Sequence, residues 1–174
     1  MSTAAAPPVL RGERVELRPL VAGDRERLIE ILSDPTVQQW WDSRGPDHSS
    51  DELLDDDEVV PFAIDLDGEM IGSIQYHEVT DPEYRSAGID VFLAAAHQDR
   101  GYGTEAVRML ARWLLEVRGH HRLTIDPAAD NLRAIRAYEK VGFRPVGVMR
   151  QYERRQDGTF HDGLLMDLLV AELR

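Results

Sequence analysis

The chain has 174 residues, enough for one domain whose core buries about 70% of the surface that the unfolded chain exposes. Its 32 acidic and 20 basic residues give a net charge of −12, which argues against a nucleic-acid partner or an anionic membrane and favours cationic or neutral small ligands. The absence of cysteine excludes disulfides, thiolate nucleophiles and cysteine-ligated zinc.

Residues 1–8 form an Ala/Pro-rich segment that lacks the basic start and the apolar stretch of a signal peptide. We expect residues 1–12 to be a flexible segment and residues 13–174 to form a single domain. No run of the sequence approaches the roughly 20 apolar residues that cross a bilayer. We therefore expect a cytoplasmic protein, either a monomer or a homodimer.

The first predicted elements are a strand and a helix. Residues 15–19 alternate between apolar and charged side chains, which is typical of a strand with one buried face. Asp24 can cap a helix that ends at Ser33, before Pro35. Because the adjacent Trp40 and Trp41 cannot share a helix face, we expect one of them in the core. The other is then free to line a substrate cleft, where its ring can hold a cation.

An acidic segment follows at residues 47–58, with seven carboxylates and no lysine or arginine. One interpretation is a solvated loop with a helical turn. The other is that the segment borders a cleft and raises the local concentration of a polycation. The sequence leaves both open.

Three antiparallel strands are predicted next. Residues 59–65 and 70–79 are strand-like runs joined at Asp67 and Gly68, a strong signal for a two-residue hairpin. Tyr76 lies within the second run, either as a packing residue or as a substrate contact. The third strand, over residues 86–93, has the period-two alternation of a strand with one buried face.

A glycine-containing loop joins this third strand to a helix that runs to Val117. The loop carries Gly101 and Gly103 directly before the apolar helical repeat. The first turn of a helix presents backbone N–H groups without intrahelical partners, and glycines let a ligand approach closely, so the loop can form a nest for a phosphate or diphosphate. Arg100 adds a cation. The alternative is that the glycines only shape a tight turn.

A rival interpretation is a dinucleotide-binding fingerprint, because residues 101–106 fit G-x-G-x-x-A and Asp126 follows near the position of a ribose-binding acid. A doubly wound nucleotide domain needs repeated strand-helix units. The sequence upstream instead predicts hairpins, and the connector after Leu93 is too long for the tight turn of that fingerprint. We therefore favour an anion nest in another fold.

The remaining chain predicts a strand at residues 122–126, a helix from Leu132 to a C-cap at Gly142, and a final hairpin of residues 143–150 and 163–170. The predicted fold class is α+β, with about seven strands and about four helices. No metal is expected, because the histidines considered show no ligand spacing: they are His77, His97, His120, His121 and His161.

The motifs resemble those of the GNAT superfamily of acetyl-CoA-dependent N-acetyltransferases. The resemblance rests on Gln98-x-x-Gly101-x-Gly103 and on Asn131, followed by a helix with Ala134 and Tyr138 and ending in Gly142-Phe143. It extends from about residue 15 to the C-terminus. It implies a mixed, mostly antiparallel twisted sheet, splayed at the acetyl-CoA site.

The implied cofactor site takes its residues from the strand end, the glycine loop and the second helix. Asn131 is expected to bind the pantetheine arm, which pairs with the backbone of Phe92 and Leu93 like an added strand. The complete predicted set for acetyl-CoA comprises Phe92, Leu93, Gln98, Arg100, Gly101, Tyr102, Gly103, Thr104, Asn131 and Ala134.

Residues 85–147 are more narrowly similar to the aminoglycoside 6′-N-acetyltransferases, through Gly88-Ile89-Asp90, Thr124-Ile125-Asp126-Pro127 and residues 131–140. This resemblance implies direct transfer of an acetyl group to the 6′-amine of an aminoglycoside antibiotic, without a covalent intermediate. Acetylation of a protein N-terminus or of a polyamine is an alternative within the same fold. A sensor that binds acetyl-CoA or the drug without turnover is a non-enzymatic one.

Three side chains are predicted to carry the chemistry. An amine with a pKa near 10 must lose a proton before it attacks, and the carboxylate of Asp90 can hold the ammonium and receive or relay that proton. Asp126 can bind a second ammonium, or its role can be only structural, as a helix-capping or turn residue. By resemblance, Tyr138 is the general acid for the departing thiolate, although a tyrosine at this position also suits packing. The substrate contacts predicted are Trp40, Trp41, Tyr76, Asp90 and Asp126.

Overall fold

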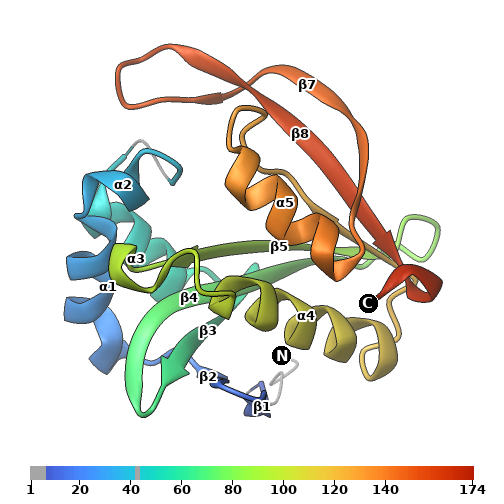
Figure 1. Ribbon diagram of the computed structural model, residues 1–174, viewed down its shortest axis with the longest axis horizontal. Coiled ribbons are helices and arrows are strands. Elements are labelled where there is room, and N and C mark those ends of the chain that lie inside the picture. The colour runs from blue at the N-terminus through green and yellow to red at the C-terminus, as the bar shows by residue number, and fades with distance from the viewer. Residues whose placement is uncertain (1–6, 42–43) are drawn as a thin grey trace.

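The structure, a computed structural model, describes residues 7–41 and 44–174. Figure 1 shows an open twisted sheet with helices against it and a long final hairpin that extends past α5. The described helices are α1 (Arg25–Leu32), α2 (Pro35–Gln38), α3 (Pro46–Asp55), α4 (Tyr102–Glu116) and α5 (Leu132–Val141). The described strands are β1 (Leu10–Arg11), β2 (Val15–Pro19), β3 (Val59–Leu66), β4 (Glu69–Val79), β5 (Ser86–Leu93), β6 (Arg122–Ile125), β7 (Arg144–Arg154) and β8 (Phe160–Leu169).

The eight described strands form one sheet in the order β1-β2-β3-β4-β5-β6-β8-β7. Every neighbouring pair is antiparallel except β5 and β6, which are parallel. The predicted mixed, mostly antiparallel sheet is therefore confirmed. The doubly wound alternative is wrong, because it needs a mainly parallel sheet.

The described residues form one more strand and one more helix than predicted. The added strand, β1, pairs with β2 inside the segment that we expected to be flexible, whose residues 1–6 lie outside the described part of the chain. The added helix, α3, lies in the acidic segment. Its hydroxyl groups bond back to the preceding turn, Ser49 to the Gly45 carbonyl and Ser50 to the Pro46 carbonyl, while Leu53 is buried.

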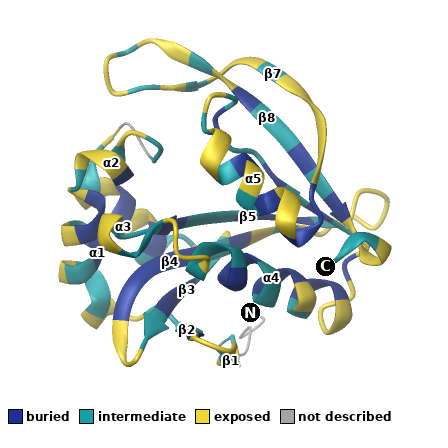
Figure 2. Ribbon diagram, in the orientation of Figure 1, coloured by how far each residue is buried: buried dark blue, intermediate teal, exposed yellow. Residues whose placement is uncertain are grey.

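Helices cover both faces of the sheet, and each face has its own hydrophobic cluster. The larger cluster joins α4 and α5 to β2–β6, and the fully buried ridge of α4 includes Val107, Leu110 and Leu114. The smaller cluster joins α1–α3 to side chains on the opposite face, among them Ala63 and Phe92. The strands in the middle of the sheet are largely buried (Figure 2). Because both of their faces are covered, these strands are mostly apolar.

The sheet opens beside β5, as the predicted splay requires. On one side, all eight residues of β5 pair with β4. On the other side, β5 pairs with β6 only at Ala87 with Leu123 and Gly88 with Thr124. From Ile89 onward the two strands diverge, which leaves an open strand edge above the start of α4.

The final hairpin is longer than predicted. Residues of β7 are almost all exposed, and the pairing of β7 with β8 shifts register between Met149 and Glu153. Figure 2 shows β7 as a largely exposed edge strand, while β8 is buried toward its C-terminal end. The hairpin thus extends past α5 with one strand in solvent.

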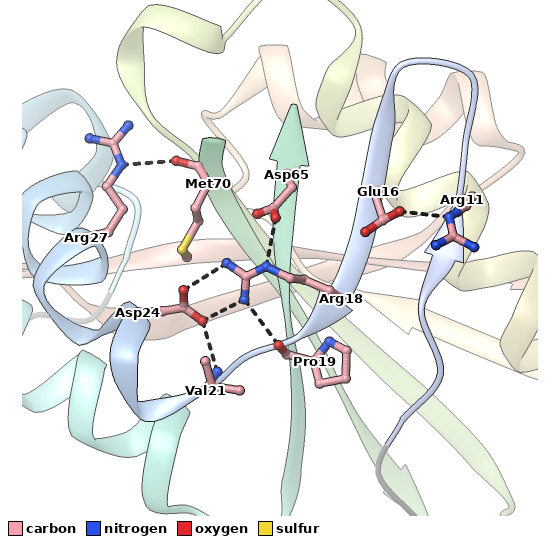
Figure 3. A network of polar contacts seen from close by, with 9 residues as sticks. All are labelled: Arg11, Glu16, Arg18, Pro19, Val21, Asp24, Arg27, Asp65 and Met70. Carbon is pink, nitrogen blue, oxygen red and sulfur yellow. Dashed lines mark hydrogen bonds and ion pairs between the residues drawn. The ribbon is translucent and has the colours of Figure 1, made fainter. Parts of the chain in front are cut away.

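A charged cluster around Arg18 ties the first strands together (Figure 3). The guanidinium donates to Asp65 on β3 at 2.7 Å and to both carboxylate oxygens of Asp24 at 2.8 Å. Asp24 also accepts from the Val21 amide at 3.0 Å, which closes the turn before α1. One arginine therefore fixes β2, β3 and the start of α1. Across the described residues, the structure contains no helix long and apolar enough to span a membrane.

Candidate active site

A cavity of about 1140 Å³ lies where β5 and β6 diverge. Its walls come from the end of β5, the loop before α4, one face of α5, the segment after α2 and the β7–β8 hairpin. The open edge of β5 thus borders this cavity.

Two carboxylates predicted from the sequence meet in this cavity. Asp90 lies on β5 and Asp126 directly follows β6, so the two come from the neighbouring strands that diverge here. Burial raises the pKa of Asp90 above its ordinary value, and the nearby charge of Asp126 raises it further. The Gln75 amide, 3.4 Å from Asp90 Oδ2, opposes this effect. A carboxylate with a raised pKa is a better proton acceptor near neutral pH.

Tyr138 lines the same cavity from α5. Its side chain is buried, and its ring packs against Phe143 with the centroids 6.3 Å apart. Burial raises the pKa of Tyr138 above its ordinary value, as do the charges of Asp90 and Asp126. The phenol therefore stays protonated at neutral pH and is available as a hydrogen-bond or proton donor.

Tyr152, on β7, is a cavity residue that the sequence analysis missed. Its hydroxyl donates to Asp126 Oδ2 at 2.6 Å, and this bond is the largest cause that raises the pKa of the phenol. The ring lies against Gly163 on β8, where an added Cβ would be 2.8 Å from a ring carbon. No local sequence pattern points to Tyr152, because its position depends on the hairpin register.

Both predicted tryptophans line the cavity. The Trp41 ring packs edge-on against Phe92, with the centroids 4.6 Å apart, and contacts the smaller core cluster. Trp40 also faces the cavity and is partly exposed. Of the acidic segment, Glu52 reaches the cavity lining, where it pairs with Arg44 at 3.1 Å. Most of the other acids in this segment lie exposed on the outer surface.

Tyr76 is not among the described residues that line the cavity, which favours the packing alternative over a substrate contact. The side chain is buried in the larger core cluster and is absent from the described residues that line the cavity. Its ring centroid lies 5.7 Å from that of Trp113 and 6.4 Å from that of Phe62. Tyr76 therefore packs between the sheet and α4.

The glycine loop reaches the other end of the cavity. Gly101 precedes α4 with φ of +84°, a left-handed conformation that favours glycine, and Gly103 and Thr104 follow in the first turn. Their amides belong to the helix terminus and lack intrahelical partners. Arg100 and Tyr102 flank the loop and are not among the described cavity-lining residues. This end can bind an anion through main-chain N–H groups.

Two polar residues predicted to touch the cofactor also hold the local structure. Gln98 donates to the Leu93 carbonyl at 2.9 Å and accepts from Arg133 at 2.6 Å. Asn131 caps α5 by accepting from the Ala134 amide at 3.2 Å. All of these residues line the cavity, so the two side chains shape the wall near the open edge of β5.

Three cations on α5 also line the cavity and were missed in the sequence: Arg133, Arg136 and Lys140. They are three and four positions apart, a spacing that places them along one side of the helix and that can be read from the sequence. The cavity thus combines basic groups on α5 with a carboxylate pair at β5 and β6. In the part of the chain that the structure describes, no three histidine or acidic side chains are arranged to hold a metal ion.

Comparisons with known proteins agree with this geometry. Residues 14–144 match the family model described as an acetyltransferase (GNAT) domain. A curated relative, the aminoglycoside N(6′)-acetyltransferase type 1 of Klebsiella pneumoniae, is 34% identical over 160 residues, covering 79% of this chain and 77% of the relative.

Two solved structures resemble this fold. RimJ of Mycobacterium smegmatis, in complex with CoA-disulfide, superimposes with a TM-score of 0.83 at 26% identity, covering 96% of this chain and 90% of that one. The aminoglycoside acetyltransferase AAC(6′)-Ib, in complex with coenzyme A and kanamycin, gives a TM-score of 0.74 at 29% identity, covering 91% and 96%. The cavity, the splayed sheet and the matched domain together show that this chain belongs to the GNAT acetyltransferase family, whose members use acetyl-CoA.

Proposed function

We propose that this protein transfers the acetyl group of acetyl-CoA to the 6′-amine of an aminoglycoside antibiotic. The observation that carries the proposal is that Asp90, Asp126 and Tyr138 share one cavity with the amino end of α4. The same cavity thus contains carboxylates that suit a cationic amine, a protonated phenol and a candidate anion site.

The acceptor half of the proposal rests on the carboxylates. A primary amine with a pKa near 10 enters as an ammonium and must lose a proton before it can attack. The raised pKa of Asp90 suits it to hold the ammonium and to take that proton. Asp126, held by Tyr152, provides a second anionic contact, and the ring of Trp40 can cover another cationic group. An amino sugar with several ammonium groups fits this set.

The donor half rests on backbone groups. The amides at the start of α4 suit the diphosphate. The edge of β5 beyond Gly88, which pairs with no strand on the β6 side, suits an extended pantetheine arm. An added Cβ at Gly103 would lie 3.3 Å from a Leu93 methyl group, so glycine keeps the approach to this edge open. When bound, acetyl-CoA supplies an activated thioester and a good leaving group.

The transfer itself follows as direct attack by the amine, without a covalent intermediate. Holding the amine and the thioester in line supplies much of the acceleration. The Tyr138 hydroxyl can donate its proton to the departing thiolate, whose conjugate thiol has a pKa of about 8.5. A cytoplasmic location suits this activity and the absence of cysteine.

The names of the relatives support the acceptor. A curated relative at 34% identity is named an aminoglycoside N(6′)-acetyltransferase. A solved structure of similar fold is described as an aminoglycoside acetyltransferase in complex with kanamycin. Both agree with the net charge of −12, which favours a cationic ligand.

The test is release of free coenzyme A over a panel of kanamycin, spermidine and N-terminal peptides. We expect kcat/KM for kanamycin to exceed that for the other amines by at least about 100-fold. A matched aminoglycoside with a hydroxyl in place of the 6′-amine should be inactive, and NMR of the product should place the acetyl group on the 6′ nitrogen. Preference for spermidine or peptides, or binding without turnover, would contradict the proposal.

A further inference from the structure

The amino end of α4 is held from outside the cavity by one side chain, Arg14, which precedes β2. Its Nη1 donates to the Arg100 carbonyl at 2.9 Å, and its guanidinium lies over the Tyr102 ring, 4.9 Å from the centroid. Its Nε donates to Glu105 Oε2 at 2.8 Å. Arg14 thus contacts Arg100 in the loop, the first helical residue and the end of the first turn.

Glu105 completes this arrangement. It is 9% exposed, and its Oε1 accepts from the amide of Arg14 at 2.8 Å and from that of Val15 at 3.3 Å. The turn between β1 and β2 packs closely here, because a Cβ added at Gly12 would lie 2.5 Å from the same oxygen. Burial by itself would raise the pKa of Glu105, but the bonds from Arg14 and Val15 lower it overall. The carboxylate therefore stays ionised and anchors the guanidinium.

The bond to the Arg100 carbonyl decides where the next amide points. In a trans peptide the C=O and the following N–H point in opposite directions. A carbonyl drawn toward Arg14, on the outer side of the loop, turns the Gly101 N–H to the opposite side. Gly101 lines the cavity, whereas Arg14 is not among the described residues that do so. The arginine therefore acts on the cavity through the loop.

We propose that Arg14 is a positioning residue for diphosphate binding: it orients the Gly101 amide and fixes the loop before α4, with Glu105 as its anchor. This inference rests on acetyl-CoA as the donor shared by the family and not on the identity of the acceptor. It links the first strands of the chain to a loop that lies 86 residues further on.

The experiment compares Arg14→Met with Arg14→Lys and with the control Arg11→Met. Arg11 lies on β1, and its pair with Glu16 is exposed to solvent, so its loss should leave ligand affinity unchanged. Methionine keeps the apolar stem of the Arg14 side chain as far as the position of Nε but loses every donor. A lysine can keep the pair with Glu105 but cannot also donate in the same geometry to the Arg100 carbonyl.

Affinities are measured by titration calorimetry with coenzyme A and by tryptophan fluorescence with pantetheine, which lacks the diphosphate. We expect Arg14→Met to raise the Kd of coenzyme A about tenfold. This is the effect of losing one well-aligned hydrogen bond from the Gly101 amide to the charged diphosphate. The Kd of pantetheine should not change, and Arg14→Lys should recover only part of the loss. If Arg14→Met does not fold, Arg14→Lys alone must still raise the Kd of coenzyme A about threefold.

Three results would overturn the proposal. The first is an unchanged Kd of coenzyme A in a folded Arg14 variant. The second is an equal rise for pantetheine, which would indicate a general loss of structure. The third is full recovery by lysine, which would mean that only the positive charge matters.

Discussion

The hydroxyl of Tyr152 on β7 donates to Oδ2 of Asp126 at 2.6 Å, and both residues line the cavity. The two residues come from different strands, and the bond links the exposed hairpin to the carboxylate pair. We expect Tyr152→Phe to raise the KM of the amine about tenfold, because a bond to a charged group is worth about 1.5 kcal/mol. Steady-state kinetics should show an unchanged KM for acetyl-CoA.

The control for this variant is Tyr84→Phe, which removes a hydroxyl from a tyrosine that is 71% exposed and lies outside the cavity lining. It should leave both KM values unchanged. If Tyr152→Phe behaves in the same way, Asp126 does not depend on the hairpin for its position.

Asp90→Asn should lower kcat/KM about 100-fold to 1000-fold, because the amide cannot accept the proton of the ammonium. The affinity for coenzyme A should remain. The same substitution should stabilise the fold at neutral pH, since burial and Asp126 raise the pKa of this carboxyl. An exposed acid changed in the same way, Asp55→Asn, should alter neither property.

The sign of the pH dependence follows from the raised pKa of Asp90. The folded protein binds its proton more tightly than the unfolded chain, so stability falls as pH rises from the ordinary value of 3.8 through the raised folded value. Asp90→Asn should lack the part of this loss of stability that comes from the Asp90 carboxyl. Urea unfolding at several pH values measures it, and parallel curves for the two proteins would contradict the assignment.

Tyr138→Phe should lower kcat about tenfold with little change in either KM, because the lost proton donor acts on the leaving thiolate. The ring is kept, so its packing against Phe143 and the thermal stability should change little. The raised pKa keeps the wild-type phenol protonated across the neutral range. An unchanged kcat would make Tyr138 a packing residue only.

Gly101→Val should reduce the affinity for coenzyme A by at least about 100-fold. At φ of +84° a β-branched residue is strained, and its Cβ would lie 3.2 Å from Arg14 Nη2. Gly68→Val is the matched control, because Gly68 has the same φ of +84° and no atom within 4 Å of an added Cβ. Calorimetry should show normal affinity for this control and loss for the loop variant.

Arg18→Met should destabilise the fold by about 3 kcal/mol, because it leaves the largely buried carboxylates of Asp24 and Asp65 without their shared cation. Hydrogen bonds from Arg18 are the largest cause that lowers the pKa of Asp24. The stabilisation by Asp24 is therefore complete above its ordinary pKa of 3.8 and is lost as pH falls through the lowered value. Urea unfolding at pH 7 and below pH 3.8 should show the difference shrinking in acid.

Local patterns in the sequence predicted most of the sheet and the helices α4 and α5. The alternation in residues 86–93, the Asp67-Gly68 turn and the Gly142 cap each depend on a few neighbouring residues, and the structure has the corresponding β5, hairpin and end of α5. The glycine loop was predictable for the same reason. A phosphate nest needs only a strand, a loop and a helix start in succession.

The acidic segment shows where local patterns fail. Its charges outnumber the few apolar residues, of which Leu53 is buried, so the sequence predicted no more than a helical turn there. Helix α3 is held by two kinds of contact. Leu53 packs in the smaller core cluster, and Arg25 of α1 pairs with Asp47 and Asp51 of α3. These contacts join segments that are apart in the sequence, and the helix propensity of the segment itself does not reflect them.

The sequence by itself predicted most of the secondary elements, the glycine loop before α4 and the candidate carboxylates at 90 and 126, because each depends on residue type and short spacing. Only the tertiary structure decided that Tyr76 is buried in the core, that Tyr152 reaches Asp126 and that Arg14 holds the loop before α4. The physical reason is that these contacts join residues 14 to 91 positions apart, and their formation depends on strand register and on the faces that the helices cover.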